Sequence, residues 1–420
     1  MKQKTNQETR VVITGLGIIA PNGIGKDSFW KANLRGISGV ENITCFDTSN
    51  FKTKIGAEVK GFLPQKYINS SILNQLDRFA QFGVTAAKMA KAEAGIYGKW
   101  ENPEKTGICI GSGLGGIIFH EDIIEQILKE RNKRPLPITV PKVMPNSVSA
   151  QISILLKTTG PNLTISTACS SGLQAIGLAF DLIKSKRAEA VLAGGVEAPF
   201  SYATFSAFDS LRVMSQRNCL PQEASCPFAL NRDGFVLGEG AGIVVMETLK
   251  SARKRNAVIY AEILGFGSNS SAYHMVMPQP RGRDIAKAMQ LALDQAKLSA
   301  QKIDYINAHG TSTKANDRVE TMAIKNVFGK HSKQLSISST KSMIGHTIAA
   351  SGAIGLISTC LSIKHSIIPP TINLLQADPA CDLNYTPNKA QEKNISFGMV
   401  NAFGFGGNNA VVVLGKMCDN

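Results

Sequence analysis

"TISTACSSGLQAIGLAF" at residues 164–180 and "SISSTKSMIGHTIAASGAIGLI" at residues 336–357 follow the same plan. Each begins with a β-favouring run, passes through a polar turn and continues into small apolar residues typical of a buried helix. A looser pair, "TGICIGSGLGG" (106–116) and "DYINAHGTST" (304–313), joins a strand pattern to a turn of glycine, serine and threonine. The shared order predicts two similar halves that meet near residue 255.

Short β-rich runs alternate with helical runs along the 420 residues, which indicates an α/β protein. We expect residues 1–255 and 256–420 to form the two halves, with a site where they meet. The least patterned region, 201–231, is expected to be an ordered excursion that carries binding surface. Strands are expected at 11–14, 107–110, 163–166, 190–193, 242–246, 303–307, 335–338 and 410–414, and helices at 74–94, 172–184, 284–296, 317–327 and 348–364.

Cys169 stands between a strand pattern and a helix pattern in the first of these stretches. A buried cysteine is usually an inert small hydrophobe. At the N-terminus of a helix, however, the helix dipole stabilises a thiolate and lowers the thiol pKa by roughly one unit. Both readings stay open from the position of Cys169 alone.

Other chemically capable residues occupy similar turns in the second half. His309 ends a strand pattern in "INAHGTST", and His346 follows Lys341 by five positions in "STKSMIGHTIAASG". The glycine loop "AFGFGGNNA" (402–410) offers backbone N–H groups that could hold an oxyanion. We expect these groups to join Cys169 in a catalytic site, and the remaining histidines (120, 274, 331 and 365) to be structural.

The motif "GSGLGG" (111–116) has the G-x-G-x-x-G spacing of a dinucleotide loop. The charged helical run that follows lacks the second strand and the acidic residue that such a fold needs. We therefore expect a tight turn between packed elements rather than a nucleotide site.

The composition is that of a folded protein, with 43% hydrophobic and 18% charged residues. The eight cysteines form no C-x-x-C pair, which argues against a zinc site or a disulfide scaffold and favours a reducing cytoplasm. We expect no secretory signal in "MKQKTNQETR" and no apolar stretch long enough to span a membrane.

The net charge is +15, with basic clusters at residues 129–134, 184–187 and 250–255. Aromatic residues make up only 6%, and no nucleic-acid-binding module is visible, so we expect no nucleic-acid partner. The clusters are either solvated helix ends or a docking face for an acidic protein.

Four motifs in this order, "TACSSG", "NAHGTST", "STKSMIGH" and "FGFGG", resemble the β-ketoacyl-acyl-carrier-protein synthases of the type II elongating group. The likeness extends to "PFALNRDGFVLGEGAG", "AGGVEAP" and "PPTINL", and it covers essentially the whole chain. It implies a thiolase fold, in which two similar α/β halves pack as αβαβα layers. It also implies a decarboxylative Claisen condensation of malonyl-acyl carrier protein with an acyl chain held on a cysteine, in fatty-acid or polyketide synthesis.

By the same resemblance, Cys169 carries the acyl group, and His309 and His346 bind the malonyl thioester. Backbone N–H groups of Cys169 and Phe405 form the oxyanion hole, Phe405 gates the thiol, and Lys341 sets the electrostatics of the site. Substrates arrive on the phosphopantetheine of an acyl carrier protein, without a metal or another cofactor. A homodimer, or a heterodimer with a chain-length-factor homologue, is expected in the cytoplasm.

The sequence departs from the family pattern at three positions. Lys314 replaces a common proline, Asn408 replaces a common threonine, and Gly355 replaces a glutamate that normally supports the lysine. Asp317 or Glu320 is expected to compensate for that glutamate. These departures favour a specialised relative, such as the ketosynthase subunit of a type II polyketide synthase.

Two other functions remain as alternatives. A non-catalytic partner subunit would lack the nucleophile, whereas Cys169 and both histidines are present. A coenzyme A thiolase would carry a second cysteine in a C-terminal motif, but Cys381 and Cys418 match no such motif.

Overall fold

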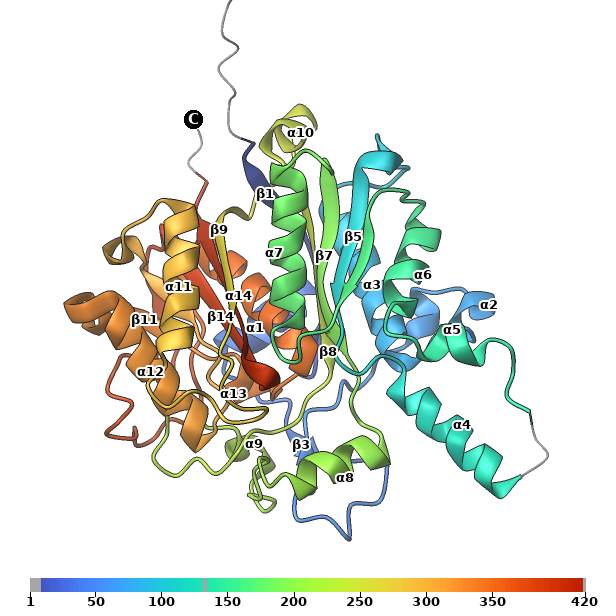
Figure 1. Ribbon diagram of the computed structural model, residues 1–420, viewed down its shortest axis with the longest axis horizontal. Coiled ribbons are helices and arrows are strands. Elements are labelled where there is room, and N and C mark those ends of the chain that lie inside the picture. The colour runs from blue at the N-terminus through green and yellow to red at the C-terminus, as the bar shows by residue number, and fades with distance from the viewer. Residues whose placement is uncertain (1–8, 131–133, 418–420) are drawn as a thin grey trace, which may run out of the picture.

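The computed structural model describes residues 9–130 and 134–417, and its centre is an eleven-stranded mixed sheet (Figure 1). Ten of the strands form one continuous path, and β2 (Gly23–Ile24) pairs with β1 at its side. Across the sheet the path runs β11 (Ser336–Ser338), β10 (Tyr305–Asn307), β14 (Phe397–Gly404), β15 (Asn408–Gly415), β9 (Ala261–Ser270), β1 (Val11–Ala20), β8 (Gly240–Thr248), β7 (Ala190–Glu197), β5 (Thr106–Gly111) and β6 (Asn162–Ile165).

The strand order is the same on both sides of the β1–β9 junction. Counted along the chain within each side, the five strands lie in the order 3-2-4-5-1. Along the chain, the second strand of each side is β5 or β10, and these two come from the looser sequence pair. The third strand of each side is β6 or β11, and these two come from the opening pair. Each third strand leads into the turn that carries the candidate site residues.

Two apolar helices lie between the two halves of the sheet. They are α7 (Ser171–Lys184) and α14 (Ser351–His365), and they share one core with alternate residues of strands from both halves, such as Ala193 and Val412. The neighbouring strand residues point to the opposite face, as the two-residue period of a strand requires. There they pack on α3 (Arg78–Glu93) in the first half and on α11 (Arg283–Ala296) and α12 (Lys314–Phe328) in the second. The predicted αβαβα layering of the thiolase fold is confirmed.

Helix α14 belongs to an apolar helical stretch that is longer than we expected from the sequence. Together with the 3-10 turn that precedes it, it forms the stretch Ile348–His365, the one helix within residues 9–130 and 134–417 that is long and apolar enough to cross a membrane. The expectation of no such stretch was wrong, although 89% of this one is buried inside the protein. Its hydroxyls do not interrupt the helix, because Thr359 and Ser362 donate to carbonyls one turn earlier, at 2.9 Å each.

The remaining elements are short, and several extend from the end of the sheet where the site lies (Figure 1). The region 201–231 is ordered, as expected, and contains α8 (Tyr202–Ser210) and α9 (Pro221–Ala224). Strands β9 and β14 were not predicted from the sequence, because glycine and polar residues interrupt their patterns. Shorter elements are α1 (Lys26–Leu34), α2 (Ser70–Leu73), α4 (Ile117–Lys129), α5 (Thr139–Val143), α6 (Ser147–Leu156), α8 (Tyr202–Ser210), α9 (Pro221–Ala224), α10 (Leu249–Lys254), α13 (Lys341–Ile344), and the ribbon strands β3 (Glu41–Asn42), β4 (Ile55–Gly56), β12 (Ile367–Ile368) and β13 (Gln391–Glu392).

Candidate active site

Cys169 lies in a sharp turn between β6 and α7. The preceding Ala168 has φ of 51°, in the left-handed region that non-glycine residues rarely adopt. The Ser171 hydroxyl stabilises the turn by donating to the Ala168 carbonyl at 2.6 Å. This geometry presents the Cys169 thiol, only 6% exposed, to a cavity of about 360 Å³.

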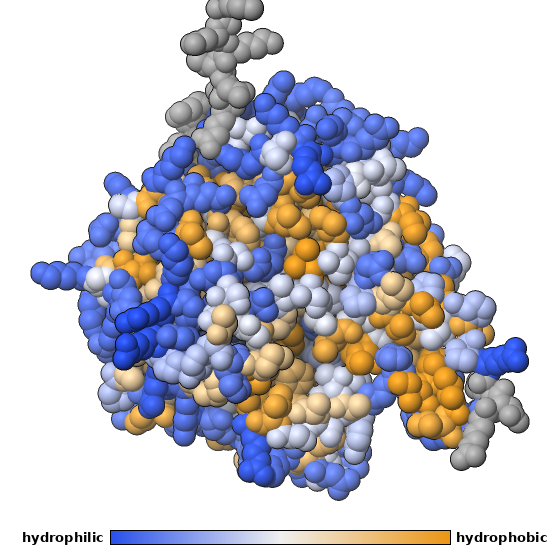
Figure 2. All heavy atoms as spheres, viewed as in Figure 1, coloured by the Kyte–Doolittle hydropathy of each residue, from blue (hydrophilic) through white to orange (hydrophobic). Residues whose placement is uncertain are grey.

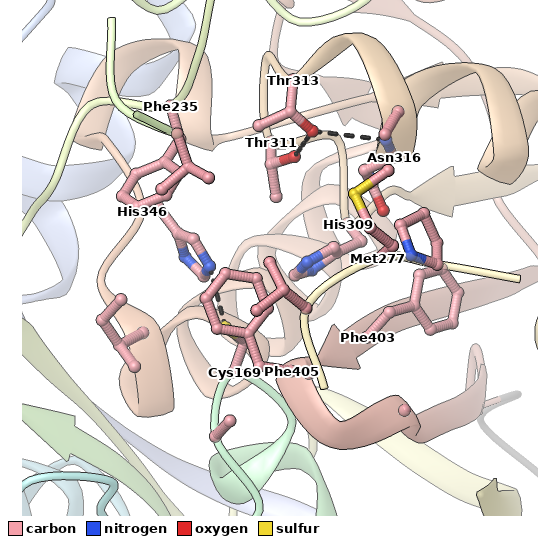
Figure 3. A pocket seen from close by; sticks show the side chains of 18 of the residues that line it. Cys169, Phe235, Met277, His309, Thr311, Thr313, Asn316, His346, Phe403 and Phe405 are labelled. Atoms are coloured by element: carbon pink, nitrogen blue, oxygen red, sulfur yellow. Dashed lines mark hydrogen bonds between the residues drawn. The ribbon is translucent and has the colours of Figure 1, made fainter. Parts of the chain in front are cut away.

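Cys169, His309 and His346 converge on this cavity from the two halves of the chain, whereas Lys341 does not line it (Figure 3). The Nε2 atom of His346 lies 3.1 Å from the Sγ atom of Cys169. The His309 ring stands nearly perpendicular to the His346 ring, with their centres 5.5 Å apart. One bound thioester can therefore reach the thiol and both imidazoles.

His346 is held by a second hydrogen bond on the far side of its ring. Its Nδ1 atom lies 2.9 Å from the Ser351 hydroxyl, which is also 3.1 Å from the Thr347 hydroxyl. Burial, followed by the positive charge of Lys341, lowers the pKa of His346 well below its usual value. The same two causes, in the same order, lower the pKa of His309, with a smaller contribution from His346. Both imidazoles are therefore neutral near pH 7.

The thiol of Cys169 is also neutral at rest. Burial raises its pKa to about 11 and outweighs the backbone N–H of Phe405 and the charge of Lys341, which lower it. The helix dipole does not produce a low-pKa thiol, because a dipole effect of up to about 2 kcal/mol is smaller than the cost of a buried thiolate. The resting site is an uncharged thiol–imidazole pair.

The glycine loop forms the wall opposite the histidines. Phe405 begins this turn, and its N–H approaches the Cys169 sulfur, as does the N–H of Cys169 itself. Gly406 and Gly407 have φ of 77° and 76°, which glycine adopts without strain. The Asn408 side chain donates to the Phe405 carbonyl at 3.2 Å. The loop thus places the Phe405 N–H beside the thiol. It also places the Phe405 ring there (Figure 3).

Lys341 is buried behind the histidines. Burial lowers its pKa to about 8, against the opposing charges of Glu320, Cys169 and Asp317. The Glu320 carboxylate accepts hydrogen bonds from the backbone N–H groups of His309 and Gly310, both at 2.8 Å. Glu320 therefore fixes the turn that carries His309 and balances the charge of Lys341.

Asp317 has a different set of partners. It lies 3.3 Å from the buried Arg232 guanidinium and accepts from the N–H groups of Thr311 and Phe228 at 3.1 Å and 2.8 Å. Burial raises its pKa to about 6, opposed mainly by Arg232. Arg232 already balances the charge of Asp317. Glu320 raises the pKa of Lys341 more than Asp317 does, which favours Glu320 as the replacement for the carboxylate missing at Gly355.

The space beside Gly355 is filled by neutral polar groups. A Cβ atom on Gly355 would lie 2.5 Å from the Asn307 Oδ1 atom. The Asn307 amide donates to the Tyr305 hydroxyl at 3.1 Å, and that hydroxyl is 2.8 Å from the Ser338 hydroxyl. In this chain an uncharged network therefore occupies the position of the family glutamate.

The "GSGLGG" motif encloses a carboxylate from the protein itself. Glu197 accepts from the N–H groups of Gly113 and Leu114 at 2.8 Å and 3.1 Å. Burial raises the pKa of Glu197 to about 7, while these backbone donors lower it. The tight-turn reading is confirmed, and the N–H groups that a cofactor phosphate would need are already engaged. Glu197 was missed by sequence reasoning, because only the fold brings it to this turn.

The cavity has one apolar and one polar wall, which the sequence did not predict. On the polar side, the Thr311 and Thr313 hydroxyls are 2.9 Å apart, next to Asn316. The apolar wall includes residues from the excursion at 201–231, which therefore does contribute to the site. The apolar lining residues beside the thiol are Leu114, Phe208, Val213, Phe235 and Ile348.

The other titratable groups lie outside this cavity or serve other contacts. His331 Nε2 is 2.9 Å from the Ile303 carbonyl, and His365 stacks on Trp30. Across residues 9–130 and 134–417, no group of His, Cys, Asp and Glu side chains has a metal-binding arrangement.

Known proteins share both the sequence and this geometry. Residues 8–252 match the profile of the β-ketoacyl synthase N-terminal domain, and residues 260–375 match that of the C-terminal domain. This chain belongs to the β-ketoacyl synthase family. As such it is an acyltransferase-type enzyme that forms carbon–carbon bonds.

Relatives of this β-ketoacyl synthase include 3-oxoacyl-acyl-carrier-protein synthases and the ketosynthase of a type II polyketide system. It is 43% identical to a 3-oxoacyl-acyl-carrier-protein synthase 2 from Coxiella burnetii, over 98% of this chain and 100% of the relative. The ishigamide ketosynthase/chain length factor structure has a TM-score of 0.91 and 34% identity, over 98% of this chain and 100% of that one. A type II polyketide acyl carrier protein in complex with its ketosynthase has a TM-score of 0.90 and 33% identity, with the same coverage.

Proposed function

We propose that this synthase transfers an acyl group from an acyl carrier protein to Cys169 and extends it by decarboxylative Claisen condensation with malonyl-acyl carrier protein. The observation that carries the proposal is the 3.1 Å contact between Cys169 Sγ and His346 Nε2, with His309 beside it in the same cavity. A non-catalytic subunit has no use for this pair.

In the first step, the Cys169 sulfur attacks the acyl thioester carbonyl while its proton passes to His346 Nε2. The N–H groups of Cys169 and Phe405 stabilise the tetrahedral oxyanion. Collapse breaks the bond to the carrier thiol, which leaves with the proton. Because the thiol and the imidazole are both neutral at rest, charge develops only in the transition state. There the two N–H groups stabilise the oxyanion, and His346 takes up the proton.

In the second step, malonyl thioester loses CO2, and the electrons of the broken bond form an enolate. The neutral imidazoles of His309 and His346 donate hydrogen bonds to the enolate oxygen. Its carbon attacks the acyl-Cys169 carbonyl, the bond to sulfur breaks, and the leaving Cys169 thiolate takes one proton from solvent water. Neutral donors suit this step, because a strongly acidic group would protonate the enolate instead of stabilising it.

His346 must accept a proton in the first step and donate a hydrogen bond in the second. The Ser351 hydroxyl on its Nδ1 side can either donate or accept, and so can Thr347 behind it. This pair accommodates both tautomers of the ring. Lys341 contributes by keeping both imidazoles neutral through its positive charge.

The relatives are the basis for proposing the metabolic role of the enzyme and the length of the acyl chain that it extends. The 43% identity to a 3-oxoacyl-acyl-carrier-protein synthase 2 favours fatty-acid elongation. The polyketide ketosynthase role is the second candidate, favoured by Gly355, Asn408 and the likeness to ketosynthase/chain-length-factor structures. Under either role the enzyme works in the cytoplasm and needs no cofactor beyond the carrier's phosphopantetheine, and the halves 1–255 and 256–420 act as one unit.

We also propose a dimer formed through β6. This strand is at the edge of the main sheet, and Leu163 on it is 37% exposed. An open edge strand is a template for pairing with another chain. Apolar side chains gather close by over α4 and α5, at the lower right of Figure 2, and the exposed ones include Ile124, Leu128, Val140 and Met144. A second copy, or a chain-length-factor homologue, would cover this surface.

Intact-protein mass spectrometry of Cys169 after incubation with acyl carrier proteins tests the function. The wild type should gain one acyl group, and Cys169→Ala should gain none and form no β-ketoacyl product. Product formation by Cys169→Ala would sink the assignment. Saturated adducts formed by the protein alone indicate fatty-acid elongation, whereas poly-β-ketone adducts that need a homologous partner indicate polyketide synthesis.

A further inference from the structure

Local features favour the positive charges in two of the three basic clusters. In the cluster 250–255, Arg255 forms an ion pair with Glu247. The cluster 184–187 lies at the C-terminal end of α7, where the helix dipole favours cations. Residues 131–133 of the third cluster lie outside the described part of the chain. A buried carboxylate that the proposed mechanism does not use lies directly behind the cavity wall.

This carboxylate belongs to Glu197, a fully buried residue at the end of β7. It accepts hydrogen bonds from two N–H groups of the glycine turn 111–116. It also accepts from the N–H of Ala349, which belongs to the second half of the chain. One side chain of the first half therefore joins its own glycine turn to the 3-10 turn Ile348–Ala350.

The 3-10 turn that Glu197 contacts is strained. Ile348 has φ of 44°, in the left-handed region that is least favourable for a β-branched residue. Backbone in such a conformation persists only where its surroundings hold it. The turn lies between His346 and Ser351, and the Ser351 hydroxyl contacts the Nδ1 atom of the His346 ring. A shift of this turn would therefore move both the ring and its hydrogen-bond partner.

The strained turn also packs directly on the helix that follows Cys169. A Cβ atom on Gly172 of α7 would lie 2.5 Å from the Ala349 carbonyl oxygen, and one on Gly195 of β7 would lie 2.2 Å from it. The backbones of the two halves thus meet with no side chain between them. Because the contact is this close, the position of the turn sets the separation of His346 from the thiol.

Glu197 acts on the cavity without lining it. Leu114 and Ile348, which belong to the two turns that it joins, are lining residues, whereas Glu197 is not. We propose that Glu197 is a positioning residue for the transfer of the acyl group to Cys169. It holds the strained turn so that the Nε2 atom of His346 stays 3.1 Å from the thiol. The proposal rests on the proposed function and adds a residue outside the cavity to it.

Two variants separate the position of the carboxylate from its charge. Glu197→Gln keeps the length of the side chain but replaces one acceptor oxygen by an NH2 donor. Because each oxygen accepts from a different backbone N–H, at least one N–H then loses its partner. Glu197→Asp keeps the negative charge but is one methylene shorter, so it no longer spans both turns.

Glu58→Gln is the matched control. Glu58 is also a buried carboxylate that accepts from two consecutive N–H groups, those of Thr44 and Cys45, and from the Thr44 hydroxyl. None of these three residues lines the cavity. The control therefore makes the same chemical change at a carboxylate that does not contact the strained turn.

The rate of acyl transfer is measured in single turnovers with hexanoyl-acyl carrier protein, by intact-protein mass spectrometry of Cys169. Both Glu197 variants should transfer the acyl group about tenfold more slowly or worse at saturation, because a small displacement of a reacting group costs rate steeply. The half-saturating carrier concentration should not change, since Glu197 does not line the cavity. Every chain should finally carry one acyl group, which shows that all chains are folded.

The control should lose stability towards urea as the Glu197 variants do, yet acylate Cys169 at the wild-type rate. A wild-type rate in either Glu197 variant, or an equal loss of rate in the control, would overturn the proposal. A loss of rate matched by an equal loss in the final extent of acylation, in both variants, would also overturn it, because misfolded chains would then explain the result. If the wild type itself takes up no acyl group, the proposed function fails, and the role of Glu197 fails with it.

Discussion

The imidazole Nε2 of His346 lies 3.1 Å from the Sγ atom of Cys169, although the two residues are 177 positions apart. Each residue lies between the third strand of its half and the helix of the central layer that follows, and the short helix α13 intervenes before His346. The repeat of one topology therefore brings a nucleophile and its proton acceptor face to face.

Replacing His346 by Asn should lower kcat for condensation by about 10²–10⁴-fold, because a general base and an enolate donor are lost together. Malonyl decarboxylation and acyl transfer to Cys169 should be measured separately, and both should fall. His365→Gln, at the exposed stacking partner of Trp30, serves as the control and should retain full activity. Unimpaired acyl transfer in His346→Asn would show that the thiol loses its proton elsewhere.

Removing the charge of Lys341 should shift the acidic limb of the activity profile. Lys341 lowers the pKa of both histidines, so Lys341→Met should raise those pKa values while burial still holds them below 6.5. Protonated imidazoles then appear at a higher pH, and the rate of malonyl decarboxylation should decline from a higher pH than in the wild type. Rates between pH 5 and 8 measure this shift. An acidic limb at the wild-type position would contradict the role assigned to Lys341.

Lys341 should also leave a mark on stability. Its pKa in the folded protein is about 8, below the 10.5 of the exposed side chain. Between these values the unfolded chain binds more protons, so this group makes stability rise with pH from 8 to 10.5 and costs at most about 3 kcal/mol below pH 8. The free energy of unfolding of the wild type should therefore rise relative to that of Lys341→Met across this pH range. A constant difference would show that Lys341 is solvated as in the unfolded chain.

A side chain at Gly355 should disturb the buried polar network. Its Cβ atom would lie 2.5 Å from Asn307 Oδ1, so Gly355→Ala should destabilise the protein by about 1–3 kcal/mol despite the helix preference of alanine. In an Asn307→Ala background the same substitution should be neutral or stabilising, since the clashing amide is gone. Urea unfolding of the four proteins forms a double-mutant cycle. Additive effects would contradict the contact.

Asn408 should keep the glycine loop closed over the thiol. Asn408→Thr removes the 3.2 Å hydrogen bond to the Phe405 carbonyl, worth about 1 kcal/mol, which favours the open loop by roughly fivefold. Alkylation of Cys169 by iodoacetamide should accelerate by up to about that factor. The exposed Cys219 provides an internal control whose rate should not change. Equal rates at Cys169 in both proteins would rule out this restraint.

Helix positions were the most predictable feature of the structure. The expected helices at 172–184 and 284–296 begin within one residue of α7 and α11. The helix expected from 74 begins at Arg78 instead, because the Asp77 carboxylate caps it by accepting from the Phe79 N–H at 3.1 Å. Strands β9 and β14 escaped prediction, since glycine and asparagine break the alternation on which a strand is recognised.

The sequence by itself determined the doubled α/β plan, the turns that carry Cys169, His309 and His346, and the family that they indicate. These features follow from the spacing of apolar residues and from short motifs, which are visible in the sequence without knowledge of the fold. Only the tertiary structure decided that Cys169 is a neutral thiol, that Glu320 holds the turn of His309 through its backbone N–H, and that Glu197 fills the glycine turn at 111–116. The physical reason is that pKa values and charge pairing depend on burial and on neighbours distant in the sequence.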